Sequence, residues 1–257
     1  MYFLGNLPRL VGPLLVPSRF PEIVAQSVGG LRTHTLRLAE RQEEGKGTTT
    51  FRFEPERPLA WQAGQHLLYT LPHERPDKKG TRRFFTIASP PHERQVQVTT
   101  RTAEPRSSFK QALLALGPGD PVSVRGPFGI FTVRDPGRPY VFIAGGVGST
   151  PIHSILLDLD HRRLSIDATL FYANSTPDFV FKPELDAVAK RHEGFGIDYV
   201  VSPRRVSADD LKAAPQFDRD PLFYITGSPG LVGHYYGLLR RMGITRRRIR
   251  RDVLVGY

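Results

Sequence analysis

The stretch "FIAGGVGSTPIHSIL", Phe142–Leu156, places a buried apolar strand directly before a glycine-rich turn. Gly146 and Gly148 occupy the first two glycine positions of the dinucleotide-binding pattern GxGxxG, but the third position holds Pro151. A proline in the first turn of a helix gives up only an N–H that has no intrahelical partner. We therefore predict that a helix begins at Pro151 and that the turn before it binds a dinucleotide. A tight turn with a purely structural role is the alternative.

The sequence around this stretch alternates between buried apolar runs and amphipathic runs. The strand-like runs are 140–146, 165–174, 196–202, 221–228 and 249–257, and the helix-like runs are 150–163, 182–192, 207–214 and 230–243. Alternation of this kind predicts a parallel α/β sheet. Ligands of such sheets bind beyond the carboxyl ends of the strands, which is where the glycine turn falls.

The preceding part of the chain has a different pattern. Short runs rich in β-branched and aromatic residues are separated by Gly, Pro and charged turns, at 48–55, 65–72, 82–89, 94–101 and 120–127. They predict a closed or sandwiched antiparallel β domain, interrupted by one helix at 107–116. A hinge is expected at 134–139. The expected organisation is an N-terminal arm (1–30), a β-barrel domain (31–136) and an α/β domain (137–257).

Composition narrows the chemistry. The 257 residues include no cysteine, which excludes disulfides, thiolate-bound iron–sulfur clusters, cysteine zinc sites and a catalytic thiol, and which is consistent with the cytoplasm. The histidines have no metal-ligand spacing, so we expect no metal. Four prolines interrupt the apolar N-terminus, which therefore predicts neither a signal peptide nor a membrane span. We expect an arm on the protein's own surface; peripheral contact with a membrane or partner is the alternative.

The chain is strongly basic, with a formal net charge of +11. Acidic proteins, anionic cofactors, membrane surfaces and nucleic acids are all compatible partners. The run Arg240–Asp252 indicates either a solvated helix end or a docking site for an acidic partner. Nucleic acid is not favoured, because the aromatic residues fall in expected strand cores and do not alternate with arginine.

Five segments, in order and across both halves, resemble motifs of the ferredoxin–NADP reductase family. They are "RFFT" (83–86), "GDPVSVRGPFGIF" (119–131), "AGGVGSTP" (144–151), "YITGSPGLV" (224–232) and "DVLVGY" (252–257). The resemblance covers residues 31–257. It implies an antiparallel β-barrel domain that binds FAD, followed by a parallel α/β domain that binds NADPH or NADH.

The resemblance also implies roles for residues of the barrel. Arg83 would hold the FAD pyrophosphate, Phe85 would pack on the flavin, and Thr86 would hydrogen-bond near flavin N5. Ser107 and Ser108 would present the N-terminus of their helix to the same pyrophosphate. The rest of the expected flavin-binding set is Phe84, Ile87, Thr100 and Arg101.

In the α/β domain, the resemblance assigns two glycine turns to NAD(P)H. The first contains Gly145, Gly146, Gly148 and Thr150, and the second contains Gly227, Ser228 and Pro229. Three positions depart from the family pattern: Thr226 replaces a cysteine, Asp252 a glutamate, and Leu254 an aromatic residue that shields the flavin. Tyr257 is the candidate to replace that aromatic. Thr86, Thr226 and Asp252 are the expected catalytic residues.

The choice between NADPH and NADH is expected to depend on the loop after the third strand of the α/β domain. Ser202, Arg204 and Arg205 can bind a 2′-phosphate, because guanidinium groups match phosphate geometry. A solvated loop is the alternative, and NADPH is only slightly favoured.

The expected function is electron transfer from NAD(P)H through FAD to a separate acidic carrier of the ferredoxin or flavodoxin type. Two alternatives remain within the same fold. One is the reductase component of an oxygenase or ferric-chelate system. The other is a non-catalytic flavin-binding subunit that docks to a complex. The departures from the family pattern at Thr226 and Leu254 favour this second alternative.

Overall fold

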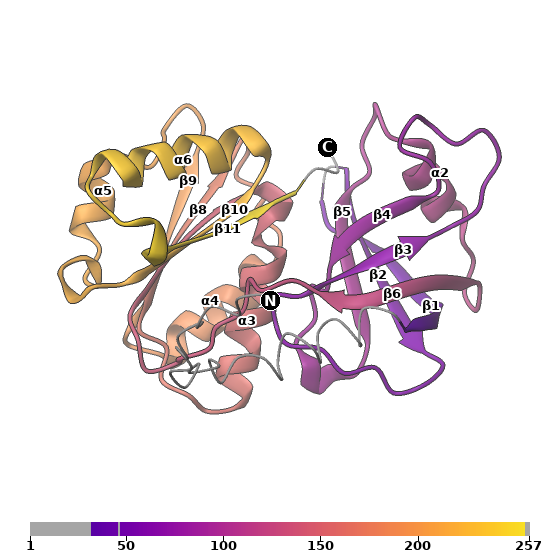
Figure 1. Cartoon of the computed structure of the whole chain (residues 1–257), viewed down its shortest axis with the longest axis horizontal. Helices are drawn as coiled ribbons and strands as arrows, with labels where there is room; N and C mark the ends of the chain where they lie inside the picture. Colours follow the sequence, from indigo (N-terminus) through magenta and orange to yellow (C-terminus); the bar gives the residue numbers. More distant parts are fainter. Residues whose placement is uncertain (1–31, 46, 255–257) are drawn as a thin grey trace, which may run out of the picture.

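The computed structural model describes residues 32–45 and 47–254. The expected N-terminal arm and Tyr257 lie outside the described residues. Figure 1 shows two bodies side by side, each built around one sheet. Within the described residues, no helix has the length and apolar character needed to cross a membrane.

The first sheet is antiparallel throughout, with strand order β4-β3-β6-β1-β2-β5. Its strands are β1 (Thr33–Glu43), β2 (Thr48–Pro55), β3 (His66–Thr70), β4 (Arg82–Thr86), β5 (Val96–Arg101) and β6 (Pro121–Phe128). Alternate side chains such as Phe51 and Phe53 are fully buried inside the curve of the sheet. The two outermost strands approach each other just past β4, where the Ala88 N–H donates to Gln97 O at 2.8 Å. The predicted antiparallel β-barrel fold is confirmed.

One helix covers the inside of this sheet. Helix α2 (Ser108–Ala115) begins at the N-cap Ser107, whose side chain accepts a hydrogen bond from the Lys110 N–H. Phe109 and Leu113 of α2 are buried against the barrel core. A short 3-10 turn, η1 (Pro91–Glu93), links β4 to β5.

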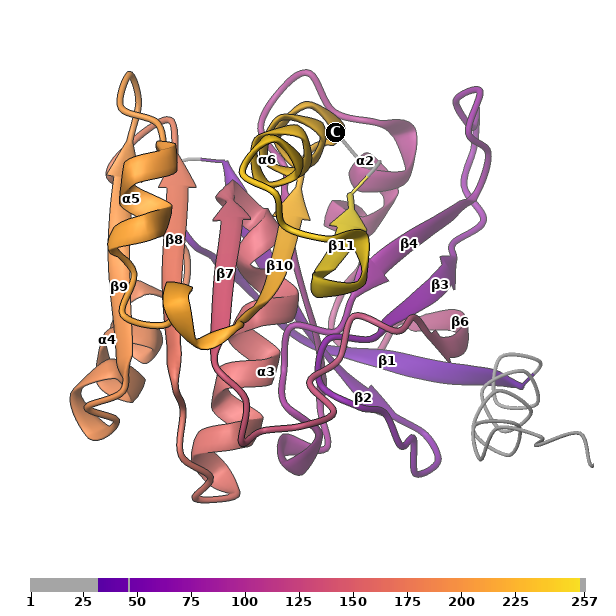
Figure 2. The ribbon, with the colours of Figure 1, turned by 60° about the vertical axis from the view of Figure 1, so that its left-hand side comes forward.

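The second sheet is parallel throughout, with order β11-β10-β7-β8-β9. Its strands are β7 (Tyr140–Gly145), β8 (Ala168–Asn174), β9 (Phe195–Val201), β10 (Leu222–Gly227) and β11 (Ile249–Val253). The chain moves outward from β7 in both directions, so the strand order reverses between β7 and β10. Ligands of open α/β sheets bind at such a switch point. Figure 2 shows these two strands side by side.

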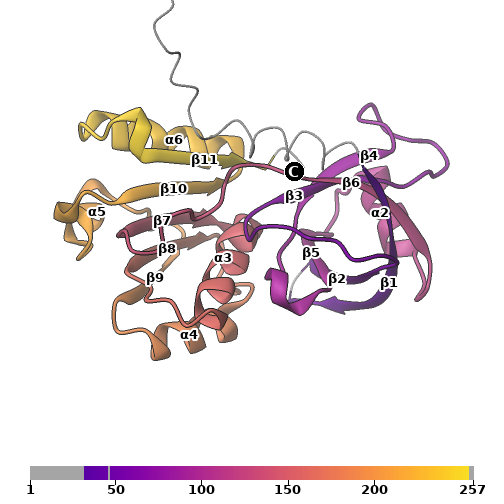
Figure 3. The same cartoon turned by 60° about the horizontal axis from the view of Figure 1, so that its bottom comes forward.

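Helices cover both faces of the parallel sheet, as the predicted α/β fold requires (Figure 3). Helices α3 (Thr150–His161) and α4 (Lys182–Arg191) pack on one face, and α5 (Ala208–Ala213) and α6 (Pro229–Arg241) pack on the other. Three 3-10 turns complete the elements: η2 (Gly146–Ser149), η3 (Phe217–Arg219) and η4 (Arg246–Arg248). Pro151 is the second residue of α3, so it lies in the first helical turn as predicted.

The two sheets are joined through helix α3. The His153 Nδ1 atom lies 2.8 Å from Ala88 O, and the Ser154 hydroxyl donates to Ser89 O at 2.7 Å. Ala88 and Phe131 also belong to the same buried cluster as the α3 side chains. The expected hinge at 134–139 falls between β6 and β7, and the domain limits drawn there stay a prediction. The contacts fix the end of β4 against the start of α3.

Candidate functional site

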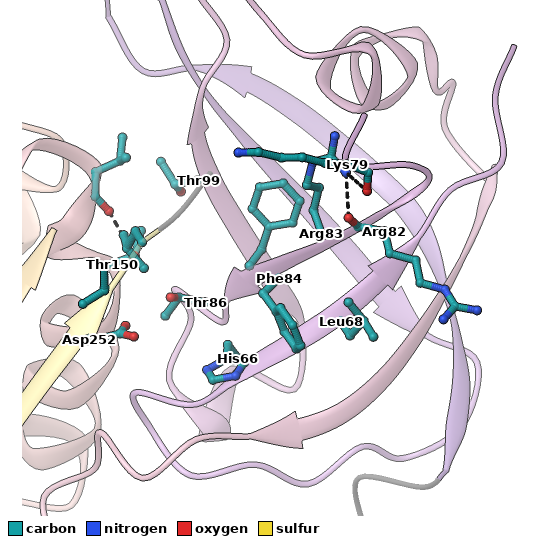
Figure 4. Close-up of a pocket in the computed structure, with 14 residues that line it drawn as sticks. His66, Leu68, Lys79, Arg82, Arg83, Phe84, Thr86, Thr99, Thr150 and Asp252 are labelled. Atoms are coloured by element: carbon teal, nitrogen blue, oxygen red, sulfur yellow. Dashed lines mark hydrogen bonds between the residues drawn. The ribbon is translucent and has the colours of Figure 1, made fainter. Parts of the chain in front are cut away.

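A cavity of about 470 Å³ lies where the two sheets meet. One wall comes from β3, β4 and β5 of the barrel, and the other comes from the turn after β7 and from β11 (Figure 4). Six of its residues belong to the set predicted from sequence: Arg83, Phe84, Phe85, Thr86, Thr150 and Asp252. Side chains separated by more than 160 positions in sequence thus line one site.

Arg83 is fixed at the basic end of the cavity. Its Nη1 donates to the carbonyl oxygens of Lys79, Gly80 and Arg82 at 2.7–2.9 Å. Its Nη2 lies 2.6 and 2.7 Å from the two carboxylate oxygens of Asp77. Burial alone would raise the pKa of Asp77, but the hydrogen bond and charge of Arg83 lower it. The guanidinium is therefore held in one orientation before any ligand binds.

The two phenylalanines of β4 point in opposite directions, as the period of a strand dictates. Phe84 is 56% exposed and makes an edge contact with His66, with ring centroids 5.3 Å apart. Phe85 turns toward the barrel core and packs against Tyr69 and Phe109 at 5.5 and 5.8 Å. The resemblance assigned flavin packing to Phe85, whereas the more open aromatic surface at this cavity is that of Phe84.

Three polar groups gather at the other end of the cavity (Figure 4). Thr86 is the last residue of β4 and lies directly opposite His66 in the β3–β4 ladder. Asp252 reaches the same end from β11. Burial lowers the pKa of His66 and raises that of Asp252 to about 6. Asp252 therefore titrates closer to neutral pH than an exposed aspartate does, whereas burial favours the neutral imidazole of His66.

A second cavity, of about 610 Å³, opens beyond the carboxyl ends of β7, β8 and β9. Gly145, Gly146 and Ser228 line its inner part, and Ser202, Arg204 and Arg205 line its outer part. Arg204 is held by Asp198 through two hydrogen bonds of 2.8 Å and by Asp210 at 3.1 Å. These carboxylates raise the pKa of Arg204. Among residues 32–45 and 47–254, Arg205 makes no such ion pair.

The two glycine turns touch where the two cavities approach each other. A Cβ on Gly148 would lie 2.6 Å from the Gly227 Cα and 3.0 Å from Thr226 O, so only glycine fits this packing. Thr226 is fully buried, and its hydroxyl oxygen has no hydrogen-bond partner among residues 32–45 and 47–254. Buried polar atoms without a partner are rare and call for an explanation such as a missing ligand.

Several predicted residues lie outside both cavities. Ile87 is fully buried in the barrel core, and its N–H donates to Gln65 O. Thr100 is buried, and the cavity is lined instead by its neighbour Thr99. The Ser107 oxygen accepts the Lys110 N–H, and the Ser108 oxygen accepts the Asp77 N–H and lies 3.0 Å from His73 Nε2. Gly148, Thr226 and Gly227 form the contact between the turns, and Pro229 is the first residue of α6. Arg101 closes β5 and is exposed.

Some cavity residues escaped the sequence prediction. His66, Leu68, Thr99 and Lys79 line the first cavity, and Asn174 and His234 line the second. His66 is found only through the β3–β4 register, which sets it opposite Thr86. Strand period gives a weaker signal for Leu68, because it lies on the same face of β3 as His66. Asn174 ends the strand that follows the glycine turn, a position typical of ligand contacts.

Comparisons with known proteins agree with this geometry. Residues 142–234 match the family model described as the oxidoreductase NAD-binding domain. The reductase component 1 of terephthalate 1,2-dioxygenase from Comamonas sp is 29% identical over 204 residues, which cover 75% of this chain and 59% of that protein. Component 2 of the same system is 32% identical over 124 residues, which cover 48% of this chain and 35% of that protein. The chain thus spans between one third and three fifths of the length of these curated relatives.

Solved structures share the whole two-sheet arrangement. The flavohemoglobin-like FAD/NAD-binding domain of nitric oxide dioxygenase from Vibrio cholerae has a TM-score of 0.71 and 24% identity, covering 86% of this chain and 98% of that one. Ferredoxin–NADP+ reductase from Plasmodium falciparum has a TM-score of 0.70 and 17% identity, covering 85% of this chain and 95% of that one.

The fold and the switch-point site define a two-domain, ferredoxin–NADP reductase-like protein, and the resemblance indicated by the sequence is confirmed. Residues 142–234 match the oxidoreductase NAD-binding domain family, and the chain shares the two-domain fold of the ferredoxin–NADP reductase-like structures.

Proposed function

We propose that this chain is an FAD-dependent NAD(P)H reductase that passes electrons to a separate redox partner. The first cavity would hold the flavin, and the second would hold the nicotinamide dinucleotide. The observation that carries the proposal is the position of the first cavity. It is walled by the barrel on one side and by the ends of the parallel sheet on the other, next to the contact between the two glycine turns.

The barrel side of the cavity fits a flavin. The exposed ring of Phe84 and the side chain of Leu68 offer flat apolar contact, and Thr86 offers a hydroxyl at one end. Arg83 and Lys79 place positive charge at the other end, where a pyrophosphate would lie. A molecule that is flat and apolar at one end and anionic at the other matches this distribution.

The sheet side fits a nicotinamide dinucleotide. The close contact of Gly148 with Gly227 leaves backbone without side chains at the switch point, where a pyrophosphate can approach. The unpartnered Thr226 hydroxyl provides a hydrogen-bonding group beside that contact. We propose that it bonds the carboxamide of the nicotinamide ring.

Hydride transfer from the reduced nicotinamide to the flavin is the chemistry that these groups supply when bound. The protein's own part is to align the rings and exclude water. Thr86 orients the ring edge that it faces. Asp252 and His66 lie at the same end of the cavity, and we propose that they hold or release the proton that accompanies electron flow.

We propose NADPH as the preferred donor. The second cavity contains Arg204, Arg205 and His234 but no aspartate or glutamate. Sites for NADH usually use a carboxylate to bind the ribose 2′-hydroxyl, whereas arginine accommodates a 2′-phosphate. Because Arg204 is held by two carboxylates, Arg205 is the arginine that would bind the phosphate. Changing Arg205 to Ser should therefore lower kcat/KM for NADPH more than for NADH.

Stopped-flow mixing of the flavin-loaded protein with NADPH or NADH under anaerobic conditions tests the proposal. Loss of flavin absorbance at a saturable rate is expected. A protein that binds flavin but is not reduced by either nucleotide would instead be a non-catalytic docking subunit. A folded protein that binds no flavin would overturn both readings.

The acceptor is proposed to dock at the mouth of the first cavity. Phe84, Ile130 and Val253 are the large apolar side chains that are strongly exposed in the described part of the chain, with exposures of 56%, 65% and 43%. Phe84 and Val253 line the cavity, and Gly129, the neighbour of Ile130, packs against the His66 ring. The net charge of +11 favours an acidic partner of the ferredoxin or flavodoxin type.

Steady-state turnover with candidate acceptors separates this reading from that of an oxygenase reductase component, which the relatives from Comamonas suggest. Ferredoxin or flavodoxin should be reduced at a rate that falls steeply with ionic strength. Changing Ile130 to Ser should lower that rate but leave reduction of the flavin by NADPH unchanged. Rapid transfer only to a ring-hydroxylating oxygenase component would favour the alternative.

A further inference from the structure

Lys110 is a buried cation without a partner. It is the third residue of α2 and is only 8% exposed. Within residues 32–45 and 47–254, no carboxylate or hydrogen-bond acceptor contacts its ammonium group. The Nζ atom of Lys110 is not fully enclosed by protein, so a ligand can still reach it. Lysines this buried are normally paired with an opposite charge.

The groups around Lys110 are also positively charged, which raises the free-energy cost of burying its ammonium group without a counter-charge. Its electrostatic neighbours are cations from three other segments: Arg101 at the end of β5, Lys79 in the loop before β4, and Arg83 in β4. Burial, followed by these three charges, lowers the pKa of Lys110 to about 8. The nearby carboxylate, Asp77, is occupied by Arg83. The first turn of α2 contains no acidic residue.

The two serines that the resemblance assigned to a phosphate already accept hydrogen bonds from the chain. The Ser107 oxygen caps the helix by accepting the Lys110 N–H at 3.3 Å. The Ser108 oxygen accepts the Asp77 N–H at 2.9 Å and lies 3.0 Å from His73 Nε2. Among the described residues, Lys110 is the buried charged side chain of this helical turn, and no group of opposite charge pairs with it.

The start of α2 lies beside a residue that lines the flavin cavity, Arg83. The Arg83 guanidinium lies over the Phe109 ring, 5.4 Å from its centroid, so the start of α2 is adjacent to the basic end of the cavity. Thr99 lines that cavity, and Arg101 lies two residues further along the same face of β5. A helix N-terminus adds partial positive charge at this point.

We propose that Lys110 binds the phosphate groups of the flavin cofactor at the N-terminus of α2, in the role that the sequence assigned to Ser107 and Ser108. This inference rests on the proposed flavin-dependent function. The ligand chemistry is a phosphate ester or anhydride, which FMN and FAD both carry and riboflavin lacks. Because Asp77 already holds Arg83, Lys110 then supplies the positive charge that neutralises the phosphate group.

Titration of the flavin-free protein with riboflavin, FMN and FAD tests the assignment through binding alone. Changing Lys110 to Met should lower the affinity for FAD and FMN by about 10- to 100-fold, which is the range for a lost charge-assisted hydrogen bond. The affinity for riboflavin should change by less than about twofold. Lys190→Met is the matched control, because it removes the same charge from an exposed site on α4. It should change none of the three affinities.

Proton uptake by the unaltered protein is a second measurement, independent of whether the variant folds well. A phosphate beside Lys110 favours its charged form, so FAD binding near pH 8.5 should take up protons. Arg101, Lys79, Arg83, Asp77 and His73 are the other charged or titratable groups around this site.

The outcomes are distinct. Equal binding of FAD by the Lys110→Met variant and the unaltered protein, or equal weakening for riboflavin and FAD, would overturn the role of Lys110 and leave the flavin-dependent function intact. Absence of proton uptake near pH 8.5 would also count against it. Failure of the unaltered protein to bind any of the three flavins would instead overturn the proposed function itself.

Discussion

At the scale of single residues, the site depends on polar groups that are buried at the carboxyl end of the parallel sheet. Thr226 and Asp252 are paired in register on β10 and β11. The Thr226 hydroxyl lacks a hydrogen bond, and burial raises the pKa of Asp252 to about 6. Both are unfavourable for folding, so a function in ligand binding or proton transfer is the physical reason we give for them.

Replacing Thr226 by Val separates stability from function. Valine has nearly the same shape but no hydroxyl, so the free energy of unfolding should stay the same or rise by about 1 kcal/mol. The rate of flavin reduction by NADPH should fall by about tenfold if the hydroxyl orients the nicotinamide. Urea unfolding and stopped-flow absorbance measure the two effects. A Thr226→Val variant that is less stable but whose flavin is reduced at the normal rate would show that the hydroxyl has a structural role.

Replacing Asp252 by Asn removes a carboxyl that opposes folding when it is ionised. Its pKa in the folded protein, about 6, lies above the ordinary aspartate value of 3.8. The unfolded chain therefore loses this proton first, and stability falls as pH rises from about 4 to about 6. The full effect is on the order of 3 kcal/mol.

The Asp252→Asn variant should accordingly gain stability relative to the unaltered protein as pH rises from 5 to 7, with no further gain above pH 7. Chemical unfolding of the flavin-free proteins across this range measures the difference. A constant difference at every pH would mean that Asp252 is ionised in the folded protein well below pH 6.

At the scale of elements, the sequence patterns located most strands and helices. The pattern at 48–55 matches β2 at both ends, and the helices of the α/β half begin within a residue of the predicted positions. Strand β8 begins at Ala168 rather than at 165. The run 82–89 ends as a strand at Thr86, because the Ala88 N–H leaves the ladder to bond Gln97 on β5. Such crossings cannot be seen in local periodicity.

The two glycine turns make a prediction at this scale. Changing Gly148 to Ala would put a methyl group 2.6 Å from the Gly227 Cα, and because that atom belongs to the backbone, the turns must separate. We expect weaker NADPH binding by about tenfold or more and slower flavin reduction. Isothermal titration and stopped-flow kinetics measure these effects.

Gly233→Ala is the matched control, because a methyl group at this exposed position in α6 meets no atom within 4 Å. It should leave NADPH binding unchanged and raise stability by about 0.5–1 kcal/mol, as expected for a helix interior. Equal nucleotide affinity for Gly148→Ala and the unaltered protein would show that the turns can separate without harm to the site.

At the scale of the whole molecule, helix α3 holds the two sheets in the relation that the cavity needs. His153 is only 3% exposed, stacks on Phe181 with centroids 3.9 Å apart, and bonds Ala88 across the domain boundary. Burial lowers the pKa of His153 to about 4, although the Ala88 hydrogen bond and Glu184 oppose this shift. The contact is therefore built on a neutral imidazole.

The junction should consequently weaken in acid. The unfolded chain takes up a proton on this histidine below its ordinary pKa of 6.5, whereas the folded protein does not until about pH 4. Stability from this group is complete above pH 6.5 and is lost as pH falls toward 4, by about 3 kcal/mol. Changing His153 to Gln keeps a hydrogen-bond donor for Ala88 but removes the titration.

We expect His153→Gln to be less stable than the unaltered protein at pH 8, because the stacking is lost, but to lose about 2 kcal/mol less between pH 8 and pH 5. Urea unfolding at both pH values measures this difference. The exposed His234→Gln change is the control and should leave the pH dependence as it is. If the His153→Gln variant and the unaltered protein lose the same stability between pH 8 and pH 5, groups other than His153 cause the acid sensitivity.

The two kinds of sheet and the glycine turns could be predicted from local sequence patterns. Period two and period 3.6 are local properties, and Gly148 and Pro151 mark the strand-to-helix turn without reference to any distant residue. Which side chains meet could be learned only from the folded chain. His66 lies opposite Thr86 through strand register, the Ser107 and Ser108 oxygens accept backbone N–H groups, and Lys110 lies among cations. Hydrogen-bond partners and electric fields depend on distances in space, and segments far apart in the sequence set those distances.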